Sequence, residues 1–293
     1  MIESRQVTVA GVNAPVTVFK VINTQGYYTE LCNYGASVLS IIVPDRQGKA
    51  DDVLLGYPEL SDHIQDGPYL GKTLGRFAGR IAKGKFTLNG QSYQLDINNG
   101  PNHLHGGAQG LSFRLWEYRQ CSENSLRFTT TAQHLEDGYP GDCAISVEYT
   151  WTEDNTLIID YHGTPTADSI LNLSNHSYFN LAGTPTILGH QLRIHANEYL
   201  PLNAGIGKIC AMFIVSRTIY ENCIEYMPLK RKYRWGSAGL FQSLLARRSR
   251  RTKRNDPCRR ISLSGKWKIA SNLLGLPGSC RLLWKLFRRP ANG

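Results

Sequence analysis

Apolar and polar positions alternate with a period of two through the first part of the chain, and helical spacing is rare. Short runs rich in β-branched and aromatic residues stand between turn residues, at 16–22 (VTVFKVI), 27–31 (YYTEL) and 37–43 (SVLSIIV). Runs of this length and period are typical of strands that bury one face. The pattern therefore predicts an all-β fold, with residues 59–66 as a modest helix candidate.

Two later segments each predict a β-hairpin. Between residues 86 and 95 (FTLNGQSYQL), alternating apolar residues flank Asn89-Gly90, a dipeptide suited to a tight turn with two positive φ angles. The alternating runs at 144–151 and 156–162 flank a short polar connection in the same way. Both hairpins agree with an all-β architecture.

The character of the sequence changes after about residue 203. Residues 205–293 carry 20 Lys and Arg against three acidic residues, a net charge of +17, which leaves −7 for residues 1–204. No linker rich in Pro, Gly or Ser marks the change, and a natural basic tail is usually poorer in Trp, Leu and Phe. We therefore predict a β domain over 1–204 and a basic segment over 205–293 that does not continue it.

Cysteine usage and the absence of targeting signals narrow the class of protein. Seven cysteines are scattered, without a CxxC pair or metal-ligand spacing to His, so we expect reduced thiols and no metal site. The N-terminus does not resemble a signal peptide, and no stretch approaches the roughly twenty apolar residues of a membrane span. We expect a cytoplasmic monomer or homodimer without nucleic-acid or membrane partners.

Three segments carry candidate chemistry. Histidines stand among amides and small residues at 98–107 (NNGPNHLHGG) and 171–183 (LNLSNHSYFNLAG), and two arginines stand among glycines at 75–86 (GRFAGRIAKGKF). Imidazole titrates near neutrality, and amides, hydroxyls and guanidinium groups bind sugar hydroxyls. The segments favour acid/base work on a polyhydroxylated ligand, although any one of these histidines or arginines taken singly is more often structural.

In combination, the segments resemble the galactose mutarotase (aldose 1-epimerase) family. The strings at 75–90, 98–107, 174–183 and 195–203 follow one another in the family's order and spacing, and the resemblance covers residues 1 to about 203. It implies a galactose mutarotase-like β-supersandwich. It also implies a cofactor-free interconversion of the α and β anomers of an aldohexose such as galactose or glucose.

The resemblance also implies a role for individual residues. His176, in the NHSYFNL string, would donate a proton to the sugar ring oxygen, and His105, the second histidine of HLHGG, would help to hold that oxygen. Arg80 would bind sugar hydroxyls, with Ser177 and Tyr178 lining the same pocket. The expected ligand is a small-molecule sugar.

The chain departs from the family pattern in two places. Gly79, a position expected to line the sugar site, stands where the family commonly has an asparagine, which removes one amide contact. The family's base is a glutamate late in the chain, and a GYDHN-like segment supplies a sugar-binding aspartate; neither string follows residue 203. The carboxylates of Glu221, Glu225 and Asp256 lie in contexts that match nothing in the family.

Several interpretations of residues 205–293 stay open. Our hypothesis is an out-of-frame translation near codon 204, giving a poorly folded extension. A genuine tail could form a short basic amphipathic helix at 281–289 (RLLWKLFRR), for a membrane surface or an acidic partner. The rival functions are a carbohydrate-binding pseudoenzyme without the base, and a basic-tail adaptor that binds nucleic acid or anionic lipid.

Sequencing the coding DNA across codons 195–293 tests the frameshift hypothesis. We expect another reading frame to restore the GYDHN-like and glutamate-bearing segments of the family. A single open frame confirmed by independent reads would contradict the hypothesis and make the basic tail genuine.

Overall fold

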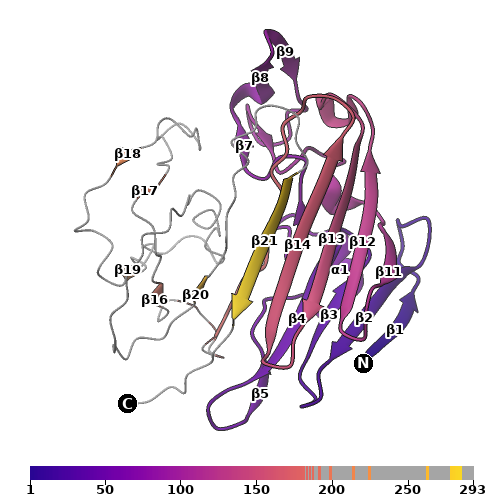
Figure 1. Cartoon of the computed structure of the whole chain (residues 1–293), viewed down its shortest axis with the longest axis vertical. Coiled ribbons are helices and arrows are strands. Elements are labelled where there is room, and N and C mark those ends of the chain that lie inside the picture. Colours follow the sequence, from indigo (N-terminus) through magenta and orange to yellow (C-terminus); the bar gives the residue numbers. More distant parts are fainter. Residues whose placement is uncertain are drawn as a thin grey trace.

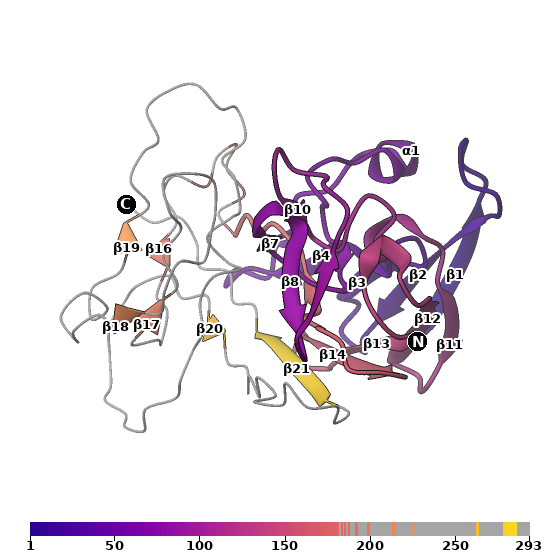
Figure 2. The ribbon, with the colours of Figure 1, turned by 90° about the horizontal axis from the view of Figure 1, so that it is seen from above.

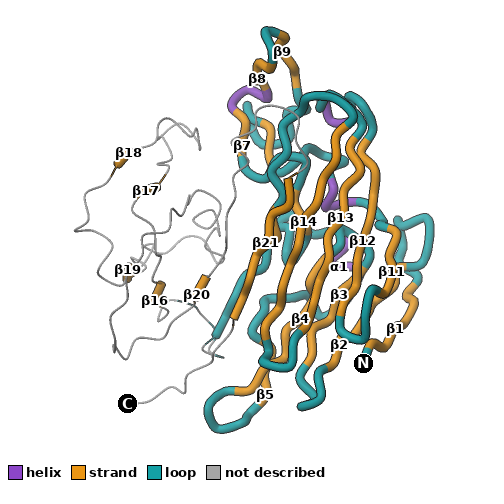
Figure 3. The backbone as a smooth tube through the Cα atoms, viewed as in Figure 1, coloured by secondary structure: helices purple, strands orange, loops and turns teal. Residues whose placement is uncertain are grey.

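A computed structural model gives the arrangement of the chain (Figure 3). It describes residues 1–181 together with residues 183, 185 and 187. It also describes the backbone of short strands at 191–192, 198–199, 213–214, 224–225, 262–263 and 278–285.

The N-terminal part folds into a five-stranded antiparallel sheet whose strands follow chain order. The run predicted at 16–22 matches its strand, and the next two predicted strands differ from the observed ones by one residue at their ends. The predicted helix is shorter than residues 59–66 and forms α1 (Leu60–Ile64). The sheet contains β1 (Ile2–Val7), β2 (Val16–Ile22), β3 (Tyr28–Cys32), β4 (Ser37–Pro44) and β5 (Ala50–Asp52).

A second, six-stranded sheet contains the longest hairpin of the described chain. The hairpin predicted at 144–162 is confirmed, with Trp151 opposite Leu157 next to its turn. Alternate residues of the strand from 143 to 151 are buried, as the two-residue period predicts. In order across the sheet, the strands are β11 (Glu117–Gln120), β12 (Ser125–Ala132), β13 (Cys143–Trp151), β14 (Thr156–Pro165), β21 (Gly278–Lys285) and β20 (Ser262–Leu263).

The amphipathic helix considered for residues 281–289 is wrong over its first part. The backbone of β21 is extended and pairs antiparallel with β14, so that Trp284 lies opposite Leu157 (Figure 1). Without β21, β14 would be an edge strand whose unpaired N–H and C=O groups favour pairing with another strand. The expectation of a poorly folded segment and the predicted boundary at residue 204 otherwise fall outside the described residues.

The two sheets pack face to face, as Figure 2 shows from above. They share one apolar core. Residues from both sheets form this core, among them Phe19 and Val147. Polar side chains also join the layers: Trp151 Nε1 donates to the carbonyl of Tyr27 over 3.1 Å, and Tyr149 donates to the carbonyl of Ala36 over 2.6 Å. The expected β-sandwich is therefore confirmed.

In the described part of the chain, five short pairs of strands lie outside the two large sheets. The predicted hairpin at 86–95 is confirmed, and its turn residues Asn89 and Gly90 have φ values of 50° and 80°. Between the strands lie the 3-10 turns at 82–84, 111–113 and 136–138. The pairs are β6 (Thr73–Leu74) with β15 (Ser174–Asn175), β7 (Arg80–Ile81) with β10 (His103–Leu104), β8 (Lys85–Leu88) with β9 (Gln91–Gln94), β16 (Gln191–Leu192) with β19 (Ile224–Glu225), and β17 (Glu198–Tyr199) with β18 (Phe213–Ile214).

The described residues contain no helix that is long and apolar enough to span a membrane.

Truncating the fully buried Trp151 tests the shared core. We expect Trp151→Ala to lower the free energy of unfolding by about 3–5 kcal/mol, because it leaves a cavity and removes the bond to Tyr27. Urea unfolding measures this loss. The control Leu135→Ala, at a side chain that is 55% exposed, should change stability by less than about 0.5 kcal/mol. Equal stability of the two variants would contradict a core at Trp151.

Candidate functional site

His105 and His176 come from segments far apart in the sequence and meet beside the sandwich. Their ring centroids lie 5.3 Å apart with the rings nearly perpendicular. His105 follows β10 and His176 follows β15, so two separate strand pairs carry them. Two tyrosines complete the cluster: the Tyr69 ring lies 5.1 Å from His105 and 6.1 Å from His176, and the Tyr178 ring lies 5.0 Å from His176.

His105 is fixed by its own backbone and by Gly79. Its N–H donates to the carbonyl of Gly79, and the N–H of Gly79 donates back to His105 Nδ1, each over 3.0 Å. Gly106 follows with a φ of +101°, and a Cβ there would lie 1.7 Å from the carbonyl oxygen of Gly75. Only glycine fits such a close approach of two backbones. The turn therefore holds the imidazole in one orientation.

The bond from Gly79 decides which nitrogen of His105 carries the proton. A neutral imidazole has one donor and one acceptor nitrogen, and here Nδ1 is the acceptor. The hydrogen consequently sits on Nε2. Burial lowers the pKa of His105 to about 3, assisted by the charges of His176 and Arg80. At neutral pH this side chain is uncharged and donates a hydrogen bond through Nε2. It is not in the imidazolium form that a general acid requires.

His176 lies in a different electrostatic environment. Its backbone N–H donates to the carbonyl of Lys72 over 2.9 Å, and its carbonyl accepts from the N–H of Gly71 over 3.1 Å. Burial lowers its pKa, while a hydrogen bond with its own backbone and the negative charge of Asp66 act in the opposite direction. A nearby carboxylate favours the imidazolium form. His176 is therefore better suited than His105 to carry and release a proton.

Ser177 and Tyr178 continue the same segment. The N–H and hydroxyl of Ser177 both donate to Asn175 Oδ1. The Tyr178 hydroxyl donates to the carbonyl of Pro68 over 3.1 Å, and burial raises the pKa of this phenol to about 12. At neutral pH Tyr178 therefore stays uncharged, and its bond to Pro68 connects the segment to the loop that carries Tyr69.

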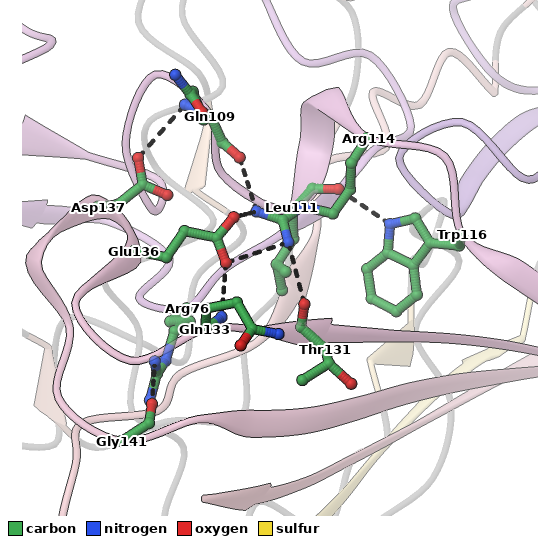
Figure 4. Close-up of polar contacts among 10 residues, drawn as sticks. All are labelled: Arg76, Gln109, Leu111, Arg114, Trp116, Thr131, Gln133, Glu136, Asp137 and Gly141. Carbon is green, nitrogen blue, oxygen red and sulfur yellow. Dashed lines mark hydrogen bonds and ion pairs between the residues drawn. The ribbon is translucent and has the colours of Figure 1, made fainter. Parts of the chain in front are cut away.

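The two arginines of the 75–86 segment have different surroundings. Arg76 is 3% exposed, and its Nη1 donates to the carbonyl of Gly141 over 2.7 Å (Figure 4). Arg80 begins β7, and its Nε donates to Asn99 Oδ1 over 2.9 Å. Arg80 pairs with Leu104 in the strand next to His105, and its charge contributes to lowering the pKa of His105. Arg76 is a structural clamp.

Gly79 leaves space next to this cluster. A Cβ at this position would meet no atom within 4 Å, although its φ of +104° is one that residues with side chains rarely adopt. The site therefore has room for a Cβ at this position, while this backbone favours glycine.

The first histidine of the HLH string is structural. His103 is fully buried, its Nε2 lies 2.6 Å from the Tyr139 hydroxyl, and its Nδ1 lies 2.8 Å from the carbonyl of Asp96. Neighbouring strand residues point to opposite faces, so residues two apart share a side in a regular strand. His103 and His105 separate because His105 leaves the strand with a φ of 55°.

Polar contacts brace the turn that follows His105. Leu111 donates its N–H to the carbonyl of Gly75 over 3.2 Å and accepts from Trp116 Nε1 over 3.0 Å (Figure 4). Arg114 and Glu136 form an ion pair beside it. These contacts attach the turn to the second sheet.

Sequence reasoning missed three residues of this region. Tyr69 touches both histidines, and Asp66 and Lys72 form a buried ion pair in the same loop. The backbone of Tyr69 has a φ of 64°, and the local sequence gives no signal that predicts this conformation. No group of three or more His, Cys, Asp or Glu in the described part of the chain could hold a metal ion.

Comparison with known proteins gives a consistent family match. The model of the aldose 1-epimerase family matches residues 17–218, which extends past the expected boundary at 204. Galactose mutarotase from Sus scrofa is 43% identical over 176 residues, 59% of this chain and 51% of its own. Aldose 1-epimerase from Haemophilus influenzae is 38% identical over 197 residues, 66% of this chain and 57% of its own. The chain thus spans about half the length of the curated relatives it matches.

Solved structures agree on the fold. The GalM/aldose epimerase homologue from C. elegans superposes with a TM-score of 0.67 at 32% identity, covering 76% of this chain and 66% of its own. Galactose 1-epimerase from Lactobacillus acidophilus gives 0.66 at 25% identity, covering 77% and 67%. These neighbours confirm the galactose mutarotase-like fold class.

The environment of His105 predicts its behaviour in solution. Because its pKa is lowered to about 3, we expect it to stay neutral, with the proton on Nε2, throughout the range in which an ordinary histidine titrates. Long-range ¹H–¹⁵N NMR spectra report both properties, and loss of the signal in His105→Gln assigns it. Titration of this imidazole near the ordinary value of 6.5 would contradict the assignment.

Proposed function

Because the chain belongs to the aldose 1-epimerase family, we propose that it interconverts the α and β anomers of an aldohexose such as galactose or glucose. The observation that carries this proposal is the contact between His176 and a second histidine, His105, whose Nδ1 is occupied by the N–H of Gly79 so that it can only donate through Nε2. The relatives named galactose mutarotase and aldose 1-epimerase support the same reaction.

Opening a hemiacetal ring requires two proton movements. A proton must reach the ring oxygen as the bond to the anomeric carbon breaks, and another must leave the anomeric hydroxyl as the aldehyde forms. Rotation about the adjacent carbon–carbon bond and reclosure, with the proton movements reversed, then gives the other anomer. We assign the proton for the ring oxygen to the imidazolium form of His176.

His105 acts beside this acid as a fixed hydrogen-bond donor. Its Nε2–H can bind the ring oxygen and hold it within reach of His176, because the bond from Gly79 prevents the imidazole from turning. The same bond occupies the Nδ1 lone pair, so His105 is not the base. We assign the base to none of the described residues, and the resemblance implies a glutamate from later in the chain.

The remaining predicted residues would bind the sugar. Arg80 offers planar donors to ring hydroxyls, and Tyr178 presents a ring next to His176. Ser177 lies between His176 and Tyr178 in the sequence. Gly79 leaves open space for the ligand next to its backbone. Residues 1–204 would then supply the sugar site.

The setting of the protein is part of the proposal. We propose a cytoplasmic monomer or homodimer whose partner is a small-molecule sugar, without nucleic-acid or membrane partners. Cys32, Cys121 and Cys143 are free thiols, which supports a reducing compartment.

Polarimetry on freshly dissolved α-galactose tests the reaction. We expect the full chain to accelerate the decay of optical rotation, and His176→Ala to reduce this acceleration by about 10² to 10⁴-fold, because it removes the general acid. Unchanged decay in His176→Ala would refute its assignment. Binding of galactose without any acceleration would instead support the carbohydrate-binding pseudoenzyme.

Two substitutions of His105 test its role as a donor. Glutamine places an amide near the position of Nε2 and asparagine places one near Nδ1. We therefore expect His105→Gln to keep more activity than His105→Asn, measured as kcat in the same assay. The opposite order would show that the Nε2 donor is not what the reaction needs.

A further inference from the structure

The loop from Asp66 to Lys72 lies against the segment that carries His176. Besides the two backbone bonds of His176, to Lys72 and from Gly71, the Asn175 amide donates to the carbonyl of Gly71 over 2.8 Å. Tyr178 adds the bond to Pro68. The position of the His176 backbone therefore depends on the conformation of this loop.

Asp66 holds the loop in that conformation. Its side chain is fully buried, its Oδ2 accepts the N–H of Leu70 over 2.7 Å, and its Oδ1 accepts the hydroxyl of Tyr57 over 2.8 Å. The ammonium of Lys72 lies 3.6 Å from Oδ2. One carboxylate thus connects the beginning of the loop to its middle and its end.

Stability alone does not explain the buried ion pair between Asp66 and Lys72, because removing two charges from water costs free energy. Lys72 is 0% exposed, and its ammonium lies 4.9 Å from the ring centroid of Phe113 and 5.5 Å from that of Tyr34. Its Nζ has no hydrogen-bond acceptor among the described residues, which leaves Asp66 as its ionic partner. Well-packed apolar residues are often as stable as such a pair, or more stable. The pair's place next to His176 suggests a use in the site.

The charge of Asp66 reaches the cluster. It partly offsets the lowering of the His176 pKa by burial, and it adds to the effect of burial in raising the pKa of Tyr69 and Tyr178. The rings packed against His176 are those of Tyr69, His105 and Tyr178. They are uncharged at neutral pH, because burial raises the pKa of the two phenols and lowers that of the imidazole. The carbonyl of Lys72 also accepts the His176 N–H, and the Lys72 ammonium is directed to Asp66. Among the charges of this loop, that of Asp66 is the one that raises the pKa of His176.

We propose that Asp66 is a positioning residue for His176: its buried carboxylate fixes the 66–72 loop to which the backbone of His176 is hydrogen-bonded, and its negative charge acts on the imidazole. This inference rests on the proposed role of His176 as the acid. Asp66 acts through His176, at a distance from the sugar, because its oxygens are already occupied by Tyr57, Leu70 and Lys72.

The test compares Asp66→Asn with Asp62→Asn in the full chain. Both variants replace a carboxylate by an amide, but Asp62 is exposed on α1 and serves as the matched control. The first measurement is the pKa of His176 by NMR titration, assigned through His176→Gln. The second is hydrogen exchange of the His176 amide, and the third is kcat and KM by polarimetry.

For Asp66→Asn we expect a lower pKa of His176, because the charge that favours the imidazolium is lost, and faster exchange of its amide. We expect kcat to fall roughly 10- to 100-fold with little change in KM, as for a misplaced catalytic group. Asp62→Asn should match the parent chain in all three. A folded Asp66→Asn with an unchanged His176 pKa and an unchanged kcat would overturn the proposal.

A second variant covers the case in which Asp66→Asn does not fold. Asp66→Asn combined with Lys72→Met removes both buried charges and leaves no unpaired one in the core. It should fold and show the same lower pKa of His176, and an unchanged pKa would overturn the proposal. If the parent chain accelerates no mutarotation, the proposed function fails, while the titration and exchange measurements still decide the role of Asp66.

Discussion

The arrangement of the described chain depends on the burial of two sheet faces in one apolar core. Each sheet alone would expose a row of apolar side chains, so both must pack together to remove this surface from water. Trp151 and Tyr149 add hydrogen bonds from one layer to the other and fix their relative position. The strand pairs β7–β10 and β6–β15, which precede His105 and His176, are attached to these packed sheets. As a result, residues about seventy positions apart in the sequence meet with defined ring geometry.

Two histidines with the same intrinsic chemistry acquire different properties through their surroundings. Burial lowers the pKa of His105 to about 3, and the bond from the backbone N–H of Gly79 fixes its tautomer. His176 is also buried, but a hydrogen bond with its own backbone and the charge of Asp66 partly offset the effect of burial on its pKa. Different environments for paired titratable groups are how a site separates the acid from the hydrogen-bond donor. The proposed mechanism relies on this separation.

Buried charge has two uses in this molecule. The guanidinium of Arg76 donates to the backbone carbonyls of Pro140 and Gly141, in the loop before β13. These bonds hold the Arg76 segment against that loop. Asp66 and Lys72 instead lie in the loop that supports His176, where an apolar pair would have been sufficient for packing. The position of each buried charge relative to the histidines, more than its burial, distinguishes a structural clamp from a residue that serves the site.

The sequence by itself determined the strands at 16–22 and 144–162, the turn at Asn89-Gly90 and the strings that contain His105 and His176, because alternation, turn chemistry and ordered motifs are local properties. It did not determine which contacts hold His103 and Arg76 in place, or that β21 is a strand. Only the tertiary structure decided these, together with Tyr69 and the Asp66–Lys72 pair. Their roles come from neighbours distant in the chain and from burial, which local sequence does not encode.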